Sequence, residues 1–174
     1  MGENYDEKHA AAVKFIEDNL KGFDFGAIEW TSDPTPWDVD PDAVYNCFGH
    51  AVGFKRFWQP PSIHGDFEGD PRFYWPPELL GGSGDNTWVH RYVEAAKTLG
   101  FDVCGDDSSW EPSFEKIVLI HSGGVFTHAS LQVSETRWSS KLGDLSDFQH
   151  PLESVLRKPF GRGAIFMKRG RQRG

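Results

Sequence analysis

The sequence of 174 residues has little of what holds small secreted proteins together or anchors proteins in membranes. It has two cysteines, Cys47 and Cys104, which form neither a CxxC pair nor a disulfide framework. We therefore expect two free thiols in a reducing, cytoplasmic compartment. No apolar run approaches the ~20 residues of a membrane-spanning helix. The N-terminus is polar and acidic, unlike a signal peptide. These absences predict no contact with a membrane.

Basic residues are in the minority, with 18 Lys and Arg against 26 Asp and Glu, for a net charge of −8. Five of the basic residues and no acidic residue lie in 162–174, so the rest of the chain carries −13. Neutralisation of phosphates by basic groups supplies most non-specific affinity for nucleic acids. The charge therefore argues against a nucleic-acid partner, and we interpret the basic terminus as a solvated tail.

The length predicts a single domain, 1–174. Within it we expect an N-terminal helix and loop (1–43), a core (44–167) and a basic tail (168–174). Apolar residues at helical spacing predict helices over 6–20, 45–58, 88–99 and 151–156. Apolar runs predict strands over 101–104, 114–121, 125–133, 137–142 and 164–167. Because most helices precede the strands, the pattern favours an α+β fold with helices packed on one face of a mostly antiparallel sheet.

The segment between the second and third predicted helices, 59–84, is rich in Pro, Gly and aromatic residues and has no clear periodicity. His64 and three acidic residues lie close together within it. Their spacing matches no metal-binding pattern, so we interpret them as a solvated loop. The sequence predicts neither a metal nor another cofactor.

Cys47 is the candidate nucleophile, in the stretch Tyr-Asn-Cys-Phe-Gly-His that follows a long loop. A helix start favours the thiolate, and its unpaired amides can hold an oxyanion. Asn46 is a candidate for supporting that oxyanion. His50 lies on a neighbouring face of the same helix and could perturb the thiolate. The alternative is that Cys47 is a small buried apolar residue.

A cysteine nucleophile needs a base, and the base needs a group that orients it. His128 lies in the predicted strand 125–133, and Ser140 follows twelve residues later on the next strand. We expect Ser140 to orient His128, while Ser139 and Lys141 point to the opposite face because strand side chains alternate. His150, Asp144 and Asp147 are alternative orienting residues.

The order Cys, His and then a polar residue resembles the papain-like cysteine hydrolases, most closely the NlpC/P60 type. The resemblance rests on Asn-Cys-Phe-Gly at 46–49, on the His128 strand, and on a polar residue about a dozen positions later. The chain also resembles a group of uncharacterised bacterial domains with an Asn-Cys-Phe start and a His-Ala…Trp-x-Ser-Lys-Leu-Gly block. In the hydrolases the third residue is usually His, Asn or an acid, whereas here Ser140 takes that place.

The resemblance implies a papain-like arrangement and a cysteine peptidase or amidase. Such an enzyme would cleave an amide, peptide or isopeptide bond through a thioester. Its catalytic residues would be Cys47, His128 and Ser140, and its partner a peptide or amide-bearing substrate. The alternative is a non-catalytic protein-binding module on the same fold.

Overall fold

A computed structural model gives the placement of residues 25–31, 45–60, 73–80, 88–141 and 147–171, together with Lys14 and Asp18. Lys14 and Asp18 are helical and form an ion pair at 3.0 Å. The rest of the predicted helix 6–20 lies outside the described residues, as do Asp144 and the acidic segment around His64. In the part of the chain that is described, no helix is long and apolar enough to span a bilayer.

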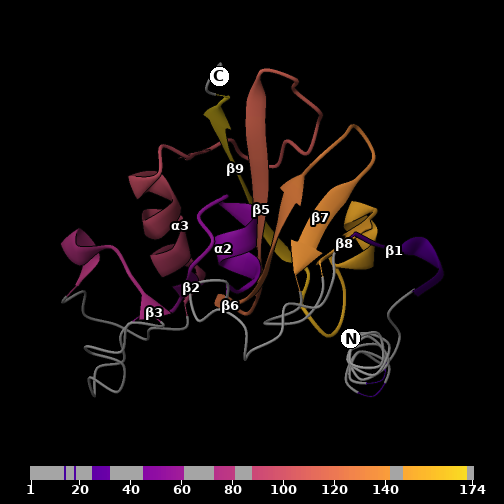
Figure 1. The fold of residues 1–174 in the computed structure, drawn as a ribbon, viewed down its shortest axis with the longest axis horizontal. Helices are drawn as coiled ribbons and strands as arrows, with labels where there is room; N and C mark the ends of the chain where they lie inside the picture. Colours follow the sequence, from indigo (N-terminus) through magenta and orange to yellow (C-terminus); the bar gives the residue numbers. More distant parts are fainter. Residues whose placement is uncertain are drawn as a thin grey trace, which may run out of the picture.

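Within the described residues, seven strands form one antiparallel sheet in the spatial order β1–β8–β7–β6–β5–β9–β4 (Figure 1). The strands are β1 (Glu29–Trp30), β4 (Asp102–Val103), β5 (Phe114–Ser122), β6 (Val125–Gln132), β7 (Trp138–Lys141), β8 (Asp147–His150) and β9 (Gly163–Gly170). The predicted α+β class and mostly antiparallel sheet are confirmed. β8 is a strand that the sequence pattern did not predict.

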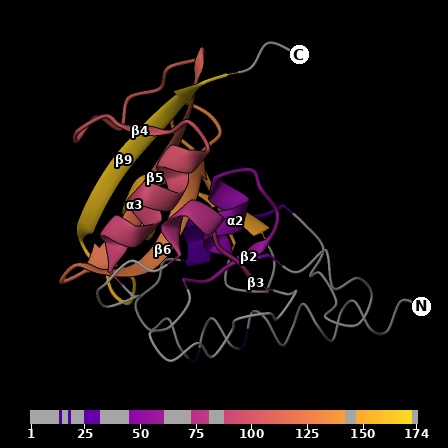
Figure 2. The same cartoon turned by 90° about the vertical axis from the view of Figure 1, so that its left-hand side faces the viewer.

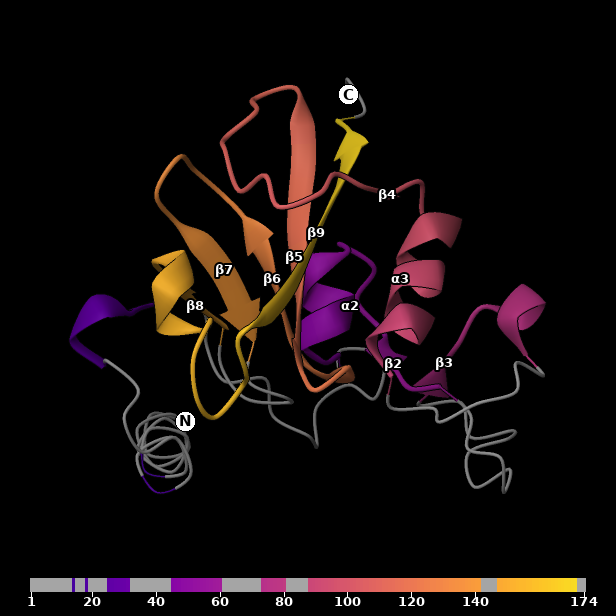
Figure 3. The same ribbon diagram turned by 180° about the vertical axis from the view of Figure 1, so that it is seen from behind.

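The helices α2 (Cys47–Ala51) and α3 (Val89–Thr98) lie on one face of the sheet (Figures 1 and 2). The opposite face carries the short 3-10 helix η4 (Leu152–Ser154), which stands beside β8 when the molecule is seen from behind (Figure 3). η4 occupies the place of the predicted helix 151–156. The remaining elements are the 3-10 helices η1 (Phe25–Ala27) and η3 (Pro77–Leu79) and a parallel pair of β2 (Phe57–Trp58) with β3 (Phe73–Tyr74).

Strand β5 is buried on both faces, as its Ile-Val-Leu-Ile run predicts. Ile117 and Leu119 pack in the core beneath α2 and α3. Val118 and Ile120 pack in a second core on the face of η4. All four side chains are fully buried. The sheet is therefore the middle layer of the domain.

Helix α2 is much shorter than the predicted helix 45–58. It ends before Gly53, whose φ of +71° is in the left-handed region that favours glycine, and the chain becomes extended at β2. Gly49 serves another purpose, because the loop after the helix folds back onto it. A Cβ added at Gly49 would lie 2.3 Å from the carbonyl oxygen of Arg56.

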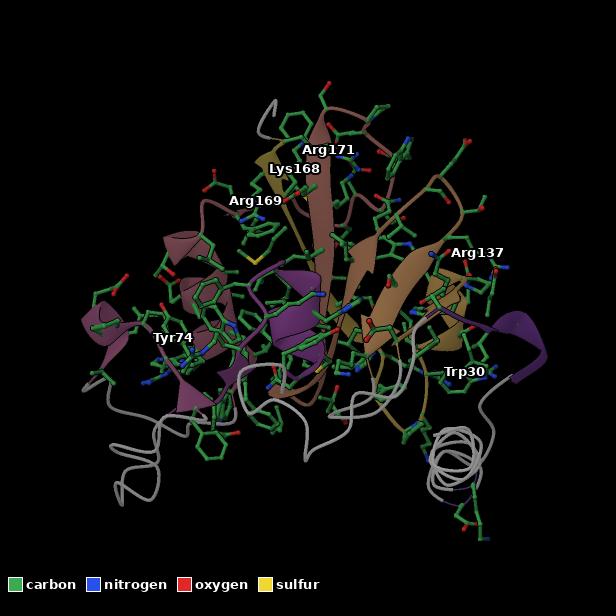
Figure 4. The ribbon with its side chains drawn as sticks, viewed as in Figure 1. Trp30, Tyr74, Arg137, Lys168, Arg169 and Arg171 are labelled. Atoms are coloured by element: carbon green, nitrogen blue, oxygen red, sulfur yellow. The ribbon has the colours of Figure 1, made fainter. Side chains whose placement is uncertain are left out.

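Arg169 of β9 ties the ends of both helices to the sheet (Figure 4). Its guanidinium donates to the carbonyls of Leu99 and Val52, at 3.1 and 3.2 Å, which are the C-cap residues of α3 and α2. It also pairs with Glu115 and lies 4.4 Å from the ring centroid of Phe101. These contacts satisfy helix-end carbonyls that would otherwise lack partners.

We expect Arg169→Met to lower the free energy of unfolding by about 2 kcal/mol, because two charge-assisted hydrogen bonds to helix ends are lost while the apolar stem remains. Urea denaturation measures the change. Arg171→Met is the control: Arg171 is exposed and binds a single carbonyl, that of Phe114. It should cost about 0.5 kcal/mol. Equal urea midpoints for the two variants would contradict the role given to Arg169.

Candidate functional site

Asn46 begins the helix that carries Cys47. Its side-chain oxygen accepts the N–H of Gly49 at 3.1 Å, and its side-chain nitrogen donates to the carbonyl of Trp58 at 2.7 Å. Asn46 is thus the N-cap of α2 and also fastens the helix to β2. The sequence predicts that Asn46 supports an oxyanion. In the structure both polar ends of its side chain are hydrogen-bonded to the protein.

The thiol of Cys47 lies against the backbone of β6. The nearby backbone amides of Ala129, Phe48 and Cys47 favour the thiolate and lower the pKa of the thiol, but burial has the larger effect and raises the pKa to about 11. The resting thiol is therefore protonated at neutral pH. This differs from the expected activation of the thiolate by the helix start, because burial outweighs the effect of the backbone amides.

The end of the β6–β7 ladder makes the N–H of Ala129 available. The two strands pair from Gln132↔Trp138 to Ser130↔Ser140, so Ala129 lies just beyond the last pair. Val133 donates its N–H to Arg137 across the same hairpin. In a strand the N–H groups of alternate residues point the same way, so that of Ala129 points toward the last residue of β7, beyond the last pair of the ladder. This backbone group lowers the pKa of the Cys47 thiol.

His128 directly precedes Ala129, and its side chain belongs to the face of the sheet opposite α2. It pairs with Ile120, and its ring stacks on Phe160 with the centroids 4.4 Å apart. Its Nε2 lies 3.0 Å from Ser140 Oγ. The structure therefore brings His128 and Ser140 together. Cys47 begins α2, on the opposite face of the sheet from the His128 imidazole, and among the described residues no hydrogen bond joins the thiol to the imidazole.

A chain of hydrogen bonds leads from His128 to the backbone behind the sheet. Ser140 Oγ lies 2.7 Å from His150 Nε2, and His150 Nδ1 lies 2.8 Å from the carbonyl oxygen of Pro151. A carbonyl only accepts, so His150 carries its proton on Nδ1 and accepts the hydroxyl proton of Ser140 at Nε2. Ser140 Oγ is then an acceptor for the Nε2–H of His128 and for the hydroxyl of Ser130, 2.6 Å away. In the neutral ring of His128, Nδ1 is therefore the basic nitrogen.

The two histidines of this hydrogen-bond chain, His128 and His150, are buried and neutral. Burial, with smaller effects from the charges of His150 and His50, lowers the pKa of His128 to about 3. Burial likewise lowers the pKa of His150 to about 4, partly offset by its hydrogen bond to Pro151. His150 thus lies within reach of the predicted site, bound to Ser140 and not directly to His128.

A second polar cluster lies on the α2 face, where Ser139 and Lys141 point as strand alternation predicts. His50 of α2 reaches Ser139 Oγ through Nε2 at 2.8 Å and Asp147 through Nδ1 at 3.7 Å. Tyr45 donates its hydroxyl to Asp147 at 3.1 Å. The sequence predicts Asp147 as an alternative partner of His128, and no sequence pattern singles out Tyr45. The contact joins residues 102 positions apart, which no local pattern reveals.

No three His, Cys, Asp or Glu side chains of the described residues converge to hold a metal ion. The site is thus defined by a thiol, an imidazole and hydroxyl groups at the end of the β6–β7 ladder of an α+β domain. A family model described as "Domain of unknown function (DUF7689)" matches residues 37–168, about three quarters of the chain, and the chain belongs to this family. No curated protein and no solved structure matches it.

Acid should destabilise the fold through the two buried histidines. Their folded pKa values lie below the ordinary value of 6.5, so the unfolded chain binds more protons between about pH 6 and pH 4. Stability is therefore complete above about pH 6.5 and falls as the pH decreases, by about 1.4 kcal/mol per pH unit for each histidine. Urea denaturation at several pH values measures the slope.

In the same experiment, His150→Gln should reduce this slope by about 1.4 kcal/mol per pH unit, the share of one histidine, while His50, whose pKa burial also lowers, keeps its own share. His90→Gln, on the exposed side of α3, is the control and should leave it unchanged. A slope that is the same in all three proteins would contradict the assignment of neutral buried histidines.

Substitution of Asn46 separates its two structural contacts. Asn46→Ser keeps an N-cap oxygen but loses the donor to Trp58, whereas Asn46→Ala loses both. We expect Ala to be less stable than Ser by about 1 kcal/mol, since this is the usual contribution of an N-cap. Thermal or urea denaturation measures the difference, and equal stability of the two variants would mean that the cap contributes nothing.

Proposed function

We propose that this protein is a cysteine hydrolase with a papain-like arrangement, acting on an amide, peptide or isopeptide bond. Cys47 is the nucleophile, His128 the base, and Ser140 the residue that orients the base. The observation that carries the proposal is the position of Cys47. Cys47 begins α2, which packs on β6, the strand that carries His128, whose imidazole is held by Ser140.

The direction of the hydrogen-bond chain supports this assignment. Because Ser140 accepts the proton on Nε2 of His128, the basic Nδ1 remains to take a proton from a thiol. The group that orients the base thus selects its tautomer, as in other nucleophile–base–orienter sites. Ser140 is a weak orienter by itself, and His150 strengthens it by accepting its hydroxyl proton.

The reaction would proceed in two steps. In the proposed first step the sulfur of Cys47 bonds to the substrate carbonyl carbon and the thiol proton passes to His128, whose imidazole would have to reach the thiol from the other face of the sheet. His128 then donates the proton to the leaving amine. A thioester remains and water hydrolyses it with His128 again as the base. Since both the thiol and the imidazole are neutral at rest, the proton moves during the attack and not before it.

Alkylation by iodoacetamide at neutral pH, read by peptide mass mapping, tests the proposal within one molecule. Cys104 is the internal control, because it is a partly buried thiol whose pKa is also raised by burial. We expect Cys47 to react at least about 10-fold faster than Cys104, since an adjacent base assists it. His128→Gln should remove this advantage, and Ser140→Ala should reduce it in a protein that remains folded by circular dichroism.

Equal rates at the two cysteines, or a Cys47 rate that His128→Gln does not change, would contradict the hydrolase. The non-catalytic alternative, a protein-binding module, would then be preferred. The wild-type comparison needs no substitution, so the test holds even if a variant fails to fold.

A further inference from the structure

The second polar cluster has the arrangement of a nucleophile, a base and an acid. His50 lies between the other two, with Nε2 2.8 Å from the hydroxyl of Ser139 and Nδ1 3.7 Å from Asp147 Oδ1. The three residues come from α2, β7 and β8. The first distance is a hydrogen bond, and the second is the looser contact that such sites often show before a substrate binds.

We propose that Ser139, His50 and Asp147 form a second nucleophilic centre, in which Ser139 accepts a small acyl group from a carboxylic ester. This centre is separate from the proposed cysteine site. It shares none of the residues Cys47, His128 and Ser140, and its side chains lie on the α2 face of the sheet, whereas those of His128 and Ser140 lie on the other face.

The acid of this centre is held in place from two further sides. Tyr45 donates to Asp147 Oδ2 at 3.1 Å, and the ammonium of Lys141 lies 3.6 Å from Oδ1. The ring of Tyr45 also stacks on that of His50, with an angle of 7° between the planes and 6.1 Å between the centroids. Tyr45 therefore fixes both the carboxylate and the plane of the imidazole.

The protonation of His50 suits a base. Burial lowers its pKa below the ordinary value, the charges of Lys141 and Lys55 act in the same direction, and Asp147 opposes them. The ring is therefore neutral at pH 7. With a carboxylate facing Nδ1, that nitrogen keeps the proton and Nε2 is bare toward the hydroxyl of Ser139.

Exposure limits the class of substrate. Ser139 is 8% exposed, and the side chains of His50 and Asp147 are each 13% exposed. A centre that is reached through so little surface admits a short acyl group and not a folded protein chain. A small carboxylic ester, the acyl donor of the proposal, meets this limit.

The acylation step is balanced within the cluster and the ester. The oxygen of Ser139 forms a bond to the acyl carbon while the ester C–O bond breaks. The hydroxyl proton passes to Nε2 of His50 and from there to the departing alkoxide, which leaves as an alcohol. Asp147 stays ionised and stabilises the imidazolium that forms in between.

Diisopropyl fluorophosphate, a small reagent for activated serines, tests the centre in the full chain. We expect one adduct on Ser139 by peptide mass mapping. His50→Gln should slow it at least about 100-fold, the usual contribution of a positioned base. Ser134→Ala, in the turn between β6 and β7, is the matched control and should not change the labelling.

Labelling that is absent, that falls on another residue, or that continues in His50→Gln within about twofold of the wild-type rate overturns the proposal. The wild-type peptide map decides the site of labelling even if His50→Gln does not fold. Because iodoacetamide reports on Cys47 and the fluorophosphate on Ser139, failure of one centre is distinguished from failure of the other.

Discussion

The carbonyl oxygen of Pro151 can only accept a hydrogen bond, and this constraint sets the direction of every bond in the polar chain behind the sheet. It places the proton of His150 on Nδ1, turns the hydroxyl of Ser140 toward His150, and leaves Ser140 as the acceptor for His128. The chain crosses β6, β7 and β8, so it also fixes their register. A slip of one residue would turn its side chains to the other face and leave buried polar groups without partners.

The two faces of the sheet use histidine in different electrostatic settings. Behind the sheet, His128 and His150 are bound to hydroxyl groups and a carbonyl, and no carboxylate of the described residues forms a hydrogen bond to either ring. On the α2 face, His50 lies beside the ion pair of Asp147 with Lys141. Behind the sheet, burial disfavours a protonated imidazole. On the α2 face, burial and the charge of Lys141 also disfavour it, but the carboxylate of Asp147 can stabilise a transient imidazolium.

Much of the sheet could be predicted from the sequence because its strands carry strong local signals. The Ile-Val-Leu-Ile run predicts that β5 is buried on both faces. Strand alternation predicts that His128 and Ser140 share one face and that Ser139 points to the other. Strand β8 has one large apolar residue, Phe148, among polar neighbours, so no apolar run marks it. The early end of α2 follows from Gly53, which interrupts a pattern that is otherwise helical.

The site was less accessible to sequence reasoning than the strands. The raised pKa of Cys47 comes from burial, and burial is a property of the packed domain rather than of the neighbouring residues. The role of Asn46 depends on the carbonyl of Trp58, which only the folded loop brings close. Asn46 and Cys47 could be recognised as important from their position in the chain, but their contacts could not.

The close packing at Gly49 restricts which sequences can adopt this site. Its backbone conformation is an ordinary helical one, so the restriction is on room and not on flexibility. Any side chain there would press on the carbonyl of Arg56 and on the ring of Trp58, whose nearest atom would lie 3.0 Å from the new Cβ. Because Asn46 is bound to the carbonyl of Trp58, that pressure would reach the first turn of α2, where the thiol of Cys47 is held. An alanine at this position would therefore act on the Cys47 thiol from a distance, through sterics alone.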